Sequence, residues 1–265
     1  MRNEMNNFSI MSYSFHGLHN VGAMNLFGYL ETLRYRYHLR NADIWNGFLD
    51  SYDDDYLETI RLNLLERDLT LVNLCCDYCH IWDEDPEVRA ANEITAWKCI
   101  HAAEVLGAKT IRIDLGVRED RISSEQLRYA ASKYDEYCQA AAKFGAKLGT
   151  ENHWGATFDP DSLERLFEAV SAENFGMLLH LGNWSVPDEE KDELDRRFAS
   201  RAMHIHLDYE HCVDAHRHMI PLREAGYTGC WSVESHKSTN EYNNVAVQLA
   251  HVKQVLAPME YEGGW

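Results

Sequence analysis

Short apolar runs alternate with longer amphipathic stretches along the whole chain. The short runs are typical of buried strands, whereas the longer stretches repeat apolar residues at helical spacing, as Leu57, Ile60 and Leu64 do. Strands are predicted over residues 8–13, 41–45, 69–75, 110–115, 146–152, 175–181, 202–207 and 229–234. Helices are predicted over residues 23–38, 54–67, 87–106, 123–144, 161–171, 189–201, 212–225 and 240–256.

These elements form strand–helix units of about 30 residues, the length of a βαβ connection. Eight such units predict an α/β protein, a single (β/α)8 TIM barrel with residues 1–265 as one catalytic domain. Terminal signals support the helices, since Ser123 and Gln126 fit a capping box and Gly107 fits a C-terminal cap. An open doubly wound sheet is the alternative, but the turn after the first strand lacks the G-x-G-x-x-G of dinucleotide folds.

Several predicted strands carry polar residues on one face and aliphatic residues on the other, because successive side chains of a strand alternate. His204 and His206 share one face of their strand, and Arg112, Glu151 and Glu234 lie on the polar faces of theirs. The polar groups concentrate toward the carboxyl ends of the strands, which is where the active site of a TIM barrel lies.

Four late strands end in residues that can bind a metal, namely Glu151, His180, His206 and Glu234. The gaps are 29, 26 and 28 residues (180 − 151, 206 − 180 and 234 − 206), about one strand–helix unit each. The ends of consecutive barrel strands converge, so we expect the four side chains to meet. Two carboxylates and two imidazoles suit Mn²⁺, Zn²⁺, Fe²⁺ or Co²⁺.

Four segments carry a family resemblance. They are Thr150-Glu151-Asn152-His153, Leu179-His180-Leu181-Gly182-Asn183-Trp184, His204-Ile205-His206-Leu207-Asp208, and Gly226-Tyr227-x-Gly229 leading to Ser232-Val233-Glu234. With them the chain resembles, over essentially its whole length, the xylose isomerase-like TIM barrels. That superfamily includes sugar isomerases, ketose 3-epimerases, inosose dehydratases and endonuclease IV.

The resemblance implies a metal held by Glu, Asp, His and Glu, which map to Glu151, His180, His206 and Glu234. His180 replaces the usual Asp, and this departure bears on metal preference. Mn²⁺ is the expected cofactor, with Zn²⁺, Co²⁺, Fe²⁺ and Mg²⁺ as alternatives. We expect His204, one layer deeper, to be a buried hydrogen-bonded residue.

The resemblance also implies a divalent-metal-dependent isomerase or epimerase of a keto sugar. Such an enzyme abstracts a proton next to a carbonyl and passes through a metal-stabilised enediolate. In the ketose epimerases of this family the two metal-bound glutamates exchange that proton, which assigns the role to Glu151 and Glu234. His153 offers a further base, because an unperturbed imidazole has a pKa near ~6.5. Asp208 is expected to orient His206.

Four tryptophans follow the predicted carboxyl ends of strands: Trp45, Trp82, Trp154 and Trp184. Indole faces stack on pyranoses and aromatic aglycones, so these residues predict a sugar or glycoside larger than a phosphorylated triose or tetrose. Plain packing of loops is the alternative. Arg112 and His16 are additional substrate-binding candidates, although Arg112 could equally form an internal ion pair with Asp114.

Composition narrows the classes of partner. With 25 Lys and Arg against 43 Asp and Glu, the formal net charge is −18, which disfavours nucleic acid and anionic membrane surfaces. No apolar run reaches the roughly 18 residues of a membrane span, and the first residues show no secretory signal. A homo-oligomer in the cytoplasm is expected.

The cysteines agree with that compartment. Seven cysteines, an odd number, predict reduced structural thiols. Cys76-Asp77-Tyr78-Cys79-His80 matches the C-x-x-C-H spacing of haem attachment, but that chemistry requires export, and a zinc site would need a second pair of ligands.

Three other functions compete with the isomerase. A lyase subunit of the C-glycoside deglycosidase type would eliminate the aglycone from a 3-keto-glycoside and work with a small β subunit. Endonuclease IV activity is disfavoured by the acidic charge. A non-catalytic sugar-binding barrel is the non-enzyme alternative.

Overall fold

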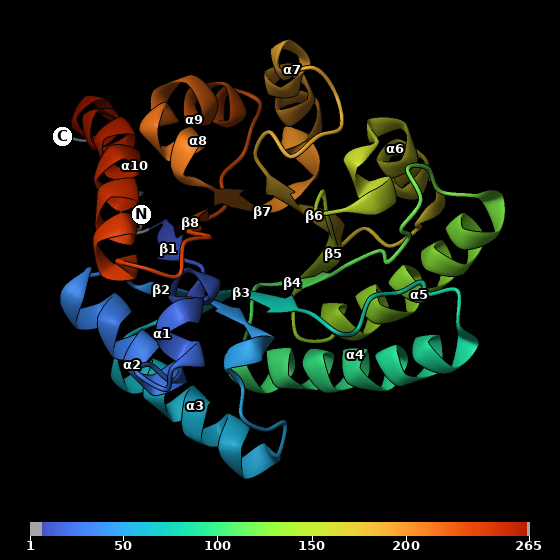
Figure 1. Ribbon diagram of the computed structural model, residues 1–265, viewed down its shortest axis with the longest axis horizontal. Coiled ribbons are helices and arrows are strands. Elements are labelled where there is room, and N and C mark those ends of the chain that lie inside the picture. Colours follow the sequence, from blue (N-terminus) through green and yellow to red (C-terminus); the bar gives the residue numbers. More distant parts are fainter. Residues whose placement is uncertain (1–6, 264–265) are drawn as a thin grey trace.

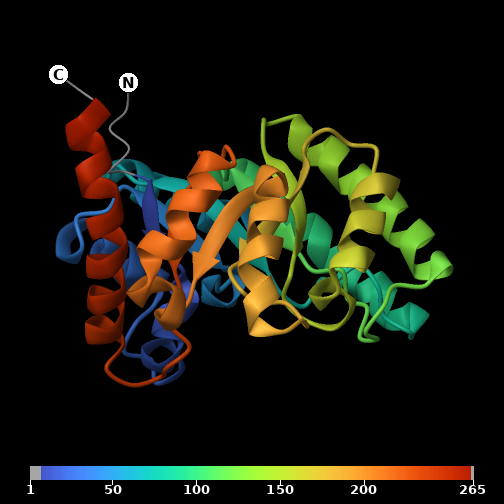
Figure 2. The same cartoon turned by 90° about the horizontal axis from the view of Figure 1, so that it is seen from above.

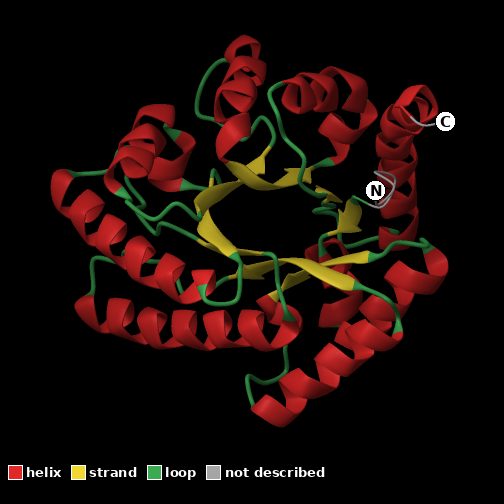
Figure 3. Ribbon diagram, turned by 180° about the vertical axis from the view of Figure 1, so that it is seen from behind, coloured by secondary structure: helices red, strands yellow, loops and turns green. Residues whose placement is uncertain are grey.

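The chain forms a TIM barrel, seen in a computed structural model that describes residues 7–263, with side chains as far as Val255. All eight strands are parallel and pair in the order β1-β8-β7-β6-β5-β4-β3-β2. Figure 3 shows them as a ring inside the helices. The strands are β1 Phe8–Ile10, β2 Asn41–Trp45, β3 Thr70–Cys76, β4 Thr110–Ile113, β5 Lys147–Glu151, β6 Phe175–His180, β7 Ala202–Leu207 and β8 Trp231–Val233.

A seam between β1 and β2 completes the ring. An isolated parallel bridge joins Met11 to Asp43. The buried Tyr29 hydroxyl lies across the same seam, where it donates to the carbonyl of Ile10 at 2.6 Å and accepts from the amide of Asp43 at 3.0 Å. The barrel is therefore nearly closed, and its first and last paired strands are fastened by side-chain as well as backbone contacts.

The helices cover the outside of the ring (Figure 1). Figure 2 shows the same layer turned by 90°, with α10 along one side. The helices are α1 His16–Asn20, α2 Leu26–Glu31, α3 Asp54–Glu66, α4 Pro86–Leu106, α5 Ser124–Ala142, α6 Pro160–Ala169, α7 Asp188–Phe198, α8 Tyr209–Val213, α9 Ala215–Glu224 and α10 Glu241–Gly263. None of them, within the described residues, combines the length and apolar character needed to cross a bilayer.

The main hydrophobic core lies between strands and helices, as the alternation of side chains predicted. Ile111, Leu148 and Ile205 are fully buried in it. Inside the ring the apolar cluster is small, with Met11, Cys75 and Leu178 at its centre. Many other interior positions carry polar or charged side chains, among them Asp43, Asn73 and His204, so hydrogen bonds and charges stabilise the middle of this barrel.

The predicted helix ends are confirmed in two places. Ser123 and Gln126 form a reciprocal capping box before α5, and Gly107 ends α4 in the left-handed region at φ 70°. One predicted helix is wrong in part, because residues 212–225 are divided at Asp214 into α8 and α9. The side chain of Asp208 caps the α8 turn, which starts the helix earlier than the apolar spacing suggested.

Several further elements differ from their predicted bounds, among them the last helix, which extends to Gly263 and not to residue 256. The helix predicted over 23–38 begins at Leu26 and passes into a π-helical turn, Thr32–Arg36. The first strand ends at Ile10, and a 3-10 turn, Ser12–Phe15, follows it. Ser12 explains this early turn, since its hydroxyl accepts a hydrogen bond from the amide of Trp45 at 2.8 Å.

Candidate metal centre

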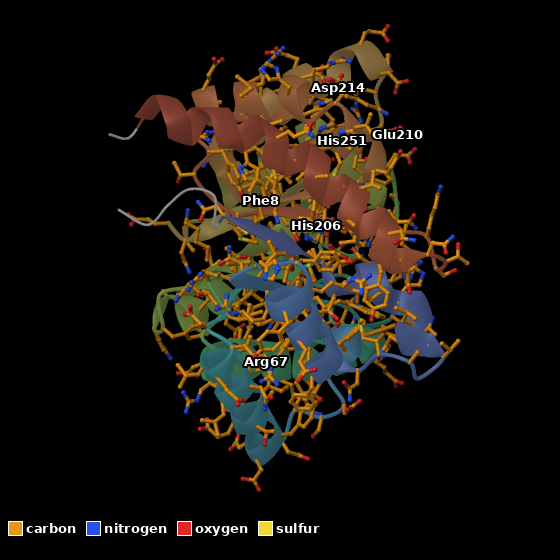
Figure 4. All side chains as sticks on the ribbon, turned by 90° about the vertical axis from the view of Figure 1, so that its left-hand side faces the viewer. Phe8, Arg67, His206, Glu210, Asp214 and His251 are labelled. Carbon is orange, nitrogen blue, oxygen red and sulfur yellow. The ribbon has the colours of Figure 1, made fainter. Side chains whose placement is uncertain are left out.

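A cavity of about 430 Å³ opens at the carboxyl ends of the strands. The labelled His206 lies in the interior of the molecule in Figure 4, whereas Glu210 and Asp214 lie at its surface. The cavity is lined by Met11, Tyr13, Trp45, Asp77, Arg112, Glu151, His153, His180, Asn183, His206, Asp208, Glu234 and His236.

The structure brings the four predicted metal ligands together in this cavity, and all four are buried. His180 Nδ1 lies 3.2 Å from Glu151 Oε1 and 3.7 Å from Glu234 Oε2. His206 Nδ1 lies 3.0 Å from Glu234 Oε2. Glu151, His180 and His206 have donor atoms close enough to hold one cation, and His180, Glu234 and His236 form an overlapping group of the same kind.

His206 supplies the test of whether a cation fits. Its Nδ1 atom is buried and has no hydrogen-bond partner among the described residues, although Glu234 Oε2 is near. A buried nitrogen left without a partner is costly, and coordination of a divalent cation would give His206 Nδ1 a partner. Carboxylate and imidazole donors are the ligand types that Mn²⁺, Zn²⁺, Fe²⁺ and Co²⁺ accept, so the residues present fit the metal.

Asp43 holds His206 from the other side. Its Oδ2 atom accepts hydrogen bonds from Nε2 of His204 at 2.8 Å and from Nε2 of His206 at 2.9 Å. Asn73 donates to the other carboxylate oxygen at 2.8 Å. Burial raises the pKa of Asp43, but the two imidazoles outweigh burial and hold that pKa well below its usual range. The prediction that His204 is a buried, hydrogen-bonded residue is confirmed.

The expectation for Asp208 is corrected by these contacts. Asp208 accepts hydrogen bonds from the backbone amide and from the ring of His211, at 3.1 and 2.7 Å. It therefore caps α8, whereas Asp43 orients His206. The end of β7 at Leu207 explains the difference, since Asp208 is the N-cap of α8, whereas Asp43 lies beside His206 inside the ring.

Arg112 is enclosed by acidic groups. Its Nη1 atom lies 2.7 Å from Asp77 Oδ1 and 3.0 Å from Asp114 Oδ2, and its Nε lies 3.1 Å from Glu151 Oε2. The internal ion pair between Arg112 and Asp114, which was predicted from the sequence as the alternative to substrate binding, is therefore present. Arg112 also lines the cavity, but its charge is already balanced by buried carboxylates.

The two glutamates are ionised despite their burial. Burial raises the pKa of Glu151, but His153, His180 and Arg112 together hold it well below its usual range. Burial also raises the pKa of Glu234, but the imidazoles of His206 and His180 outweigh burial and lower this pKa to about 2. The site thus presents two carboxylates that can bind a cation or accept a proton at neutral pH.

His153 is paired with carboxylates. Its Nδ1 atom lies 3.0 Å from Asp114 Oδ2 and 4.0 Å from Glu151 Oε2. Burial lowers the pKa of His153, but Glu151 and Asp114 outweigh burial and raise it to about 9. This raised pKa favours the protonated imidazole, and the role of His153 as a further base stays a prediction.

The four rim tryptophans separate into two pairs. Trp45 lines the cavity and donates to Asp77 Oδ2 at 2.7 Å. Trp154 lines an adjoining hollow and donates to Asp114 Oδ2 at 3.2 Å.

The other two lie outside both hollows and are packed into the scaffold. Trp82 donates to Glu84 at 2.8 Å, and Arg89 covers its ring. Trp184 donates to Asp195 at 2.7 Å and stacks on Phe198.

His16 also lies outside the cavity lining. Its ring stacks on Tyr13 at a centroid distance of 4.4 Å, and Nδ1 lies 2.8 Å from the Tyr13 carbonyl oxygen. It is Tyr13 that reaches the cavity, with His16 packed behind it.

Sequence reasoning missed several residues of the site. Asp43 accepts a hydrogen bond from His206, and Asp77 accepts one from Arg112. His236 lines the cavity, although no role was predicted for it from the sequence. His236 follows Glu234 by two positions, as His153 follows Glu151, and this repeated spacing is a signal that the sequence offered.

All seven cysteines are buried free thiols, which agrees with the predicted reduced state. Burial raises the pKa of Cys138, Cys212 and Cys230 to about 12. These thiols are therefore protonated and serve as core residues.

Comparisons with known proteins agree with this architecture. The family described as Xylose isomerase-like TIM barrel matches residues 39–255. Among curated proteins no relative matches the chain.

Three solved structures share the fold at low identity. The IolI protein with a bound zinc atom has a TM-score of 0.75 at 14% identity, covering 95% of this chain and 98% of that one. D-psicose 3-epimerase, solved in the presence of D-fructose, has a TM-score of 0.71 at 16% identity, covering 96% and 98%. The apo form of 3-keto-D-glucoside 4-epimerase YcjR from E. coli has a TM-score of 0.67 at 17% identity, covering 85% and 94%. With eight parallel strands, converging metal-ligand candidates and a match over most of its length, the chain belongs to the xylose isomerase-like TIM barrel family.

Proposed function

We propose that the protein is a divalent-metal-dependent isomerase or epimerase of a keto sugar. The observation that carries the proposal is the meeting of two buried, ionised carboxylates at one imidazole. Glu151 comes from β5 and Glu234 follows β8, yet both have an oxygen within 3.7 Å of His180 Nδ1. Two proton-accepting groups that reach one point from separate strands suit a reaction in which a proton leaves a carbon and returns from another direction.

Glu151, His180, His206 and Glu234 would hold the cation. When bound, a divalent cation supplies polarisation of the substrate carbonyl and stabilises negative charge that develops on its oxygen. One glutamate then accepts the proton from the carbon next to the carbonyl, which leaves an enediolate. The other glutamate takes up a proton from solvent and gives it either to the opposite face of the same carbon, as in an epimerase, or to the neighbouring carbon, as in an isomerase. The first glutamate then releases its proton to solvent.

The neighbouring residues have supporting roles in this proposal. Protonated His153 faces the same cavity and can donate a hydrogen bond to a substrate oxygen. Arg112 holds Glu151 in place and balances its charge. Trp45 presents an aromatic surface at the wall of the cavity, where it can stack on the apolar face of a sugar.

The lyase alternative keeps one specific observation in its favour. Elimination of an aglycone needs an acid beside the leaving group, and the protonated His153 lies between the main cavity and the adjoining hollow. A small β subunit would accompany that activity. A non-catalytic sugar-binding barrel is the remaining alternative, and it predicts sugar binding without exchange of carbon-bound protons.

The metal, the cellular compartment and the oligomeric state are also part of the proposal. Mn²⁺ is our first choice of cofactor, and the bound zinc of the IolI protein makes Zn²⁺ the next ion to test. The buried free thiols support a reducing compartment such as the cytoplasm. Sedimentation would test the expected homo-oligomer.

A screen of keto sugars and 3-keto-glycosides in deuterium oxide tests the proposal. With the protein loaded with Mn²⁺ or Zn²⁺, we expect deuterium at the carbon beside the carbonyl and formation of an isomer or epimer. A chelator should abolish both. Release of an aglycone would favour the lyase, and turnover that is complete without any metal would refute the proposed function.

A further inference from the structure

A second hollow of about 360 Å³ lies beside the metal centre. It adjoins the main cavity, because Asp77 and His153 line both. Its other walls come from the loops that follow β3, β4 and β5, including Tyr78, Arg118 and Trp154. A sugar at the metal ligands would therefore have open space next to it, toward these loops.

Trp154 forms a fixed aromatic wall of this hollow. Its indole nitrogen donates to Asp114 Oδ2 at 3.2 Å, and the ring of His80 meets it edge-on at a centroid distance of 5.9 Å. Asp114 is itself buried and paired with Arg112, so the indole is anchored to the ion pairs beneath the metal centre. An indole held in this way offers a flat apolar surface at little cost in side-chain entropy.

Arg118 gives the hollow a positive charge. Its guanidinium carbon lies 5.6 Å from the centre of the Trp154 ring, and the side chain is exposed. Within the described part of the chain Arg118 forms no ion pair, in contrast to Arg112, which three carboxylates surround. The exposed guanidinium of Arg118 can therefore contact an anionic group in this hollow, whereas the guanidinium of Arg112 in the metal cavity is enclosed by three carboxylates.

The C-x-x-C segment shapes the remaining wall. Cys76 and Cys79 are buried, and the Cys79 thiol donates to the Cys76 carbonyl at 3.3 Å. Between them Tyr78 takes a left-handed conformation, with φ 60°, and is 75% exposed. The two thiols therefore anchor a tight loop that presents an aromatic ring at the edge of the hollow.

We propose that the second hollow is a subsite for a planar aryl ring with an acidic substituent, joined to the sugar at the metal centre. Trp154 and Tyr78 would contact the ring and Arg118 its acidic group. The inference rests on the proposed function, which places the keto sugar at the metal ligands, and it defines the substrate class as an aryl glycoside of a keto sugar.

Equilibrium binding to the metal-loaded protein tests the subsite. The probes are the 3-keto derivatives of methyl, phenyl and 4-carboxyphenyl β-D-glucopyranoside, together with that of cellobiose, which replaces the aryl ring by a second sugar. In the wild type we expect the phenyl probe to bind about tenfold more tightly than the methyl probe, and the carboxyphenyl probe more tightly still. Trp154→Ala should abolish both gains, whereas Arg118→Met should remove only the gain from the carboxylate.

Two matched variants serve as controls. Trp97→Ala changes a partly exposed tryptophan of α4 that packs on Tyr137, outside the lining of both hollows. Arg121→Met removes a cation three residues after Arg118, with a side chain that is 73% exposed and lies 3.9 Å from Asp159 and Asp161. Both should bind all probes as the wild type does.

The outcomes separate the subsite from the function. Equal affinity for the methyl, phenyl and carboxyphenyl probes would overturn the subsite and leave the sugar at the metal centre intact. Tighter binding of cellobiose than of the phenyl probe would overturn the aromatic ligand class. If the protein binds its cation but none of the probes, the proposed sugar substrate fails, and the subsite fails with it.

Discussion

Asp43 and His206 are separated by 163 residues in the sequence, and their Oδ2 and Nε2 atoms lie 2.9 Å apart inside the barrel. The hydrogen bond fixes which nitrogen of His206 faces the cavity, because the ring must donate from Nε2 and present Nδ1 to the cation. A carboxylate behind a metal-binding imidazole is a common way to orient it and to raise its basicity.

Replacing Asp43 by Asn should weaken metal binding. The amide can no longer accept two strong hydrogen bonds at one charged oxygen, so His206 loses its fixed orientation. We expect the dissociation constant for Mn²⁺ or Zn²⁺ to rise by about 10- to 100-fold, measured by competition with a chelating dye. Asp208→Asn is the control, because Asp208 lines the cavity but binds His211 rather than His206. Equal losses in both variants would contradict the assignment.

Glu234→Gln should lose metal or turnover by orders of magnitude. The amide removes a charged ligand 3.0 Å from His206 Nδ1 and leaves that buried nitrogen without a carboxylate beside it. Metal content by elemental analysis and deuterium exchange into the substrate measure the two effects separately. Glu210→Gln, on the exposed surface of α8, should retain both. Full metal content with full exchange in Glu234→Gln would exclude Glu234 from both roles.

Arg112→Gln should destabilise the fold. Removing the guanidinium leaves Asp77, Asp114 and Glu151 close together without their shared cation. Breaking a buried pair in this way typically costs about 3–5 kcal/mol, which chemical denaturation at neutral pH would measure. Arg61→Gln breaks an exposed pair with Glu58 and should leave the unfolding midpoint unchanged. An Arg112→Gln variant as stable as the wild type would show that the ion pairs do not support the site.

Asp195 should make stability depend on pH. Burial raises its pKa to about 6, although hydrogen bonds from Trp184 and Gly182 act in the opposite direction. Because the pKa of Asp195 is higher in the folded protein than its ordinary value of about 3.9, folding favours the protonated carboxyl. The stability that this group adds is fully present below pH ~3.9 and is lost as the pH rises through about 6.

The free energy of unfolding of the wild type, compared with Asp195→Asn, should therefore fall from pH 4 to pH 7, by up to about 3 kcal/mol. Urea denaturation at a series of pH values measures this difference. Asp188→Asn, exposed on the same helix, should follow the wild type throughout. A constant difference between wild type and Asp195→Asn would mean that Asp195 is ionised over the whole range.

The barrel and the converging ligands could be predicted because both depend on local periodicity. Alternation within a strand decides that Glu151 and His206 face the interior, and the repeat of about one strand–helix unit brings their strand ends together. The partner of His206 could not be predicted in the same way. Asp43 meets it only through closure of the ring, and nothing local to either residue indicates that contact.

The tryptophans show another limit of reasoning from strand ends. All four follow a strand, but the path of the loop decides where each indole points. Trp45 is drawn into the cavity by Asp77, whereas Trp184 is drawn under α7 by Asp195. Asp77 follows β3 and Asp195 lies on α7, so residue type and position alone could not separate cavity walls from scaffold.

The seam between β1 and β2 links the integrity of the barrel to its chemistry. Asp43 forms the backbone bridge to Met11 that closes the ring, and its side chain holds His206. When the seam opens, Asp43 can no longer hold His206 in its metal-binding orientation. Cation affinity and opening of the seam are therefore coupled through Asp43. Backbone amides next to the seam should accordingly exchange hydrogen with solvent faster in the cation-free protein than in the cation-bound protein. Their exchange rates would then measure how much of the protein holds a cation.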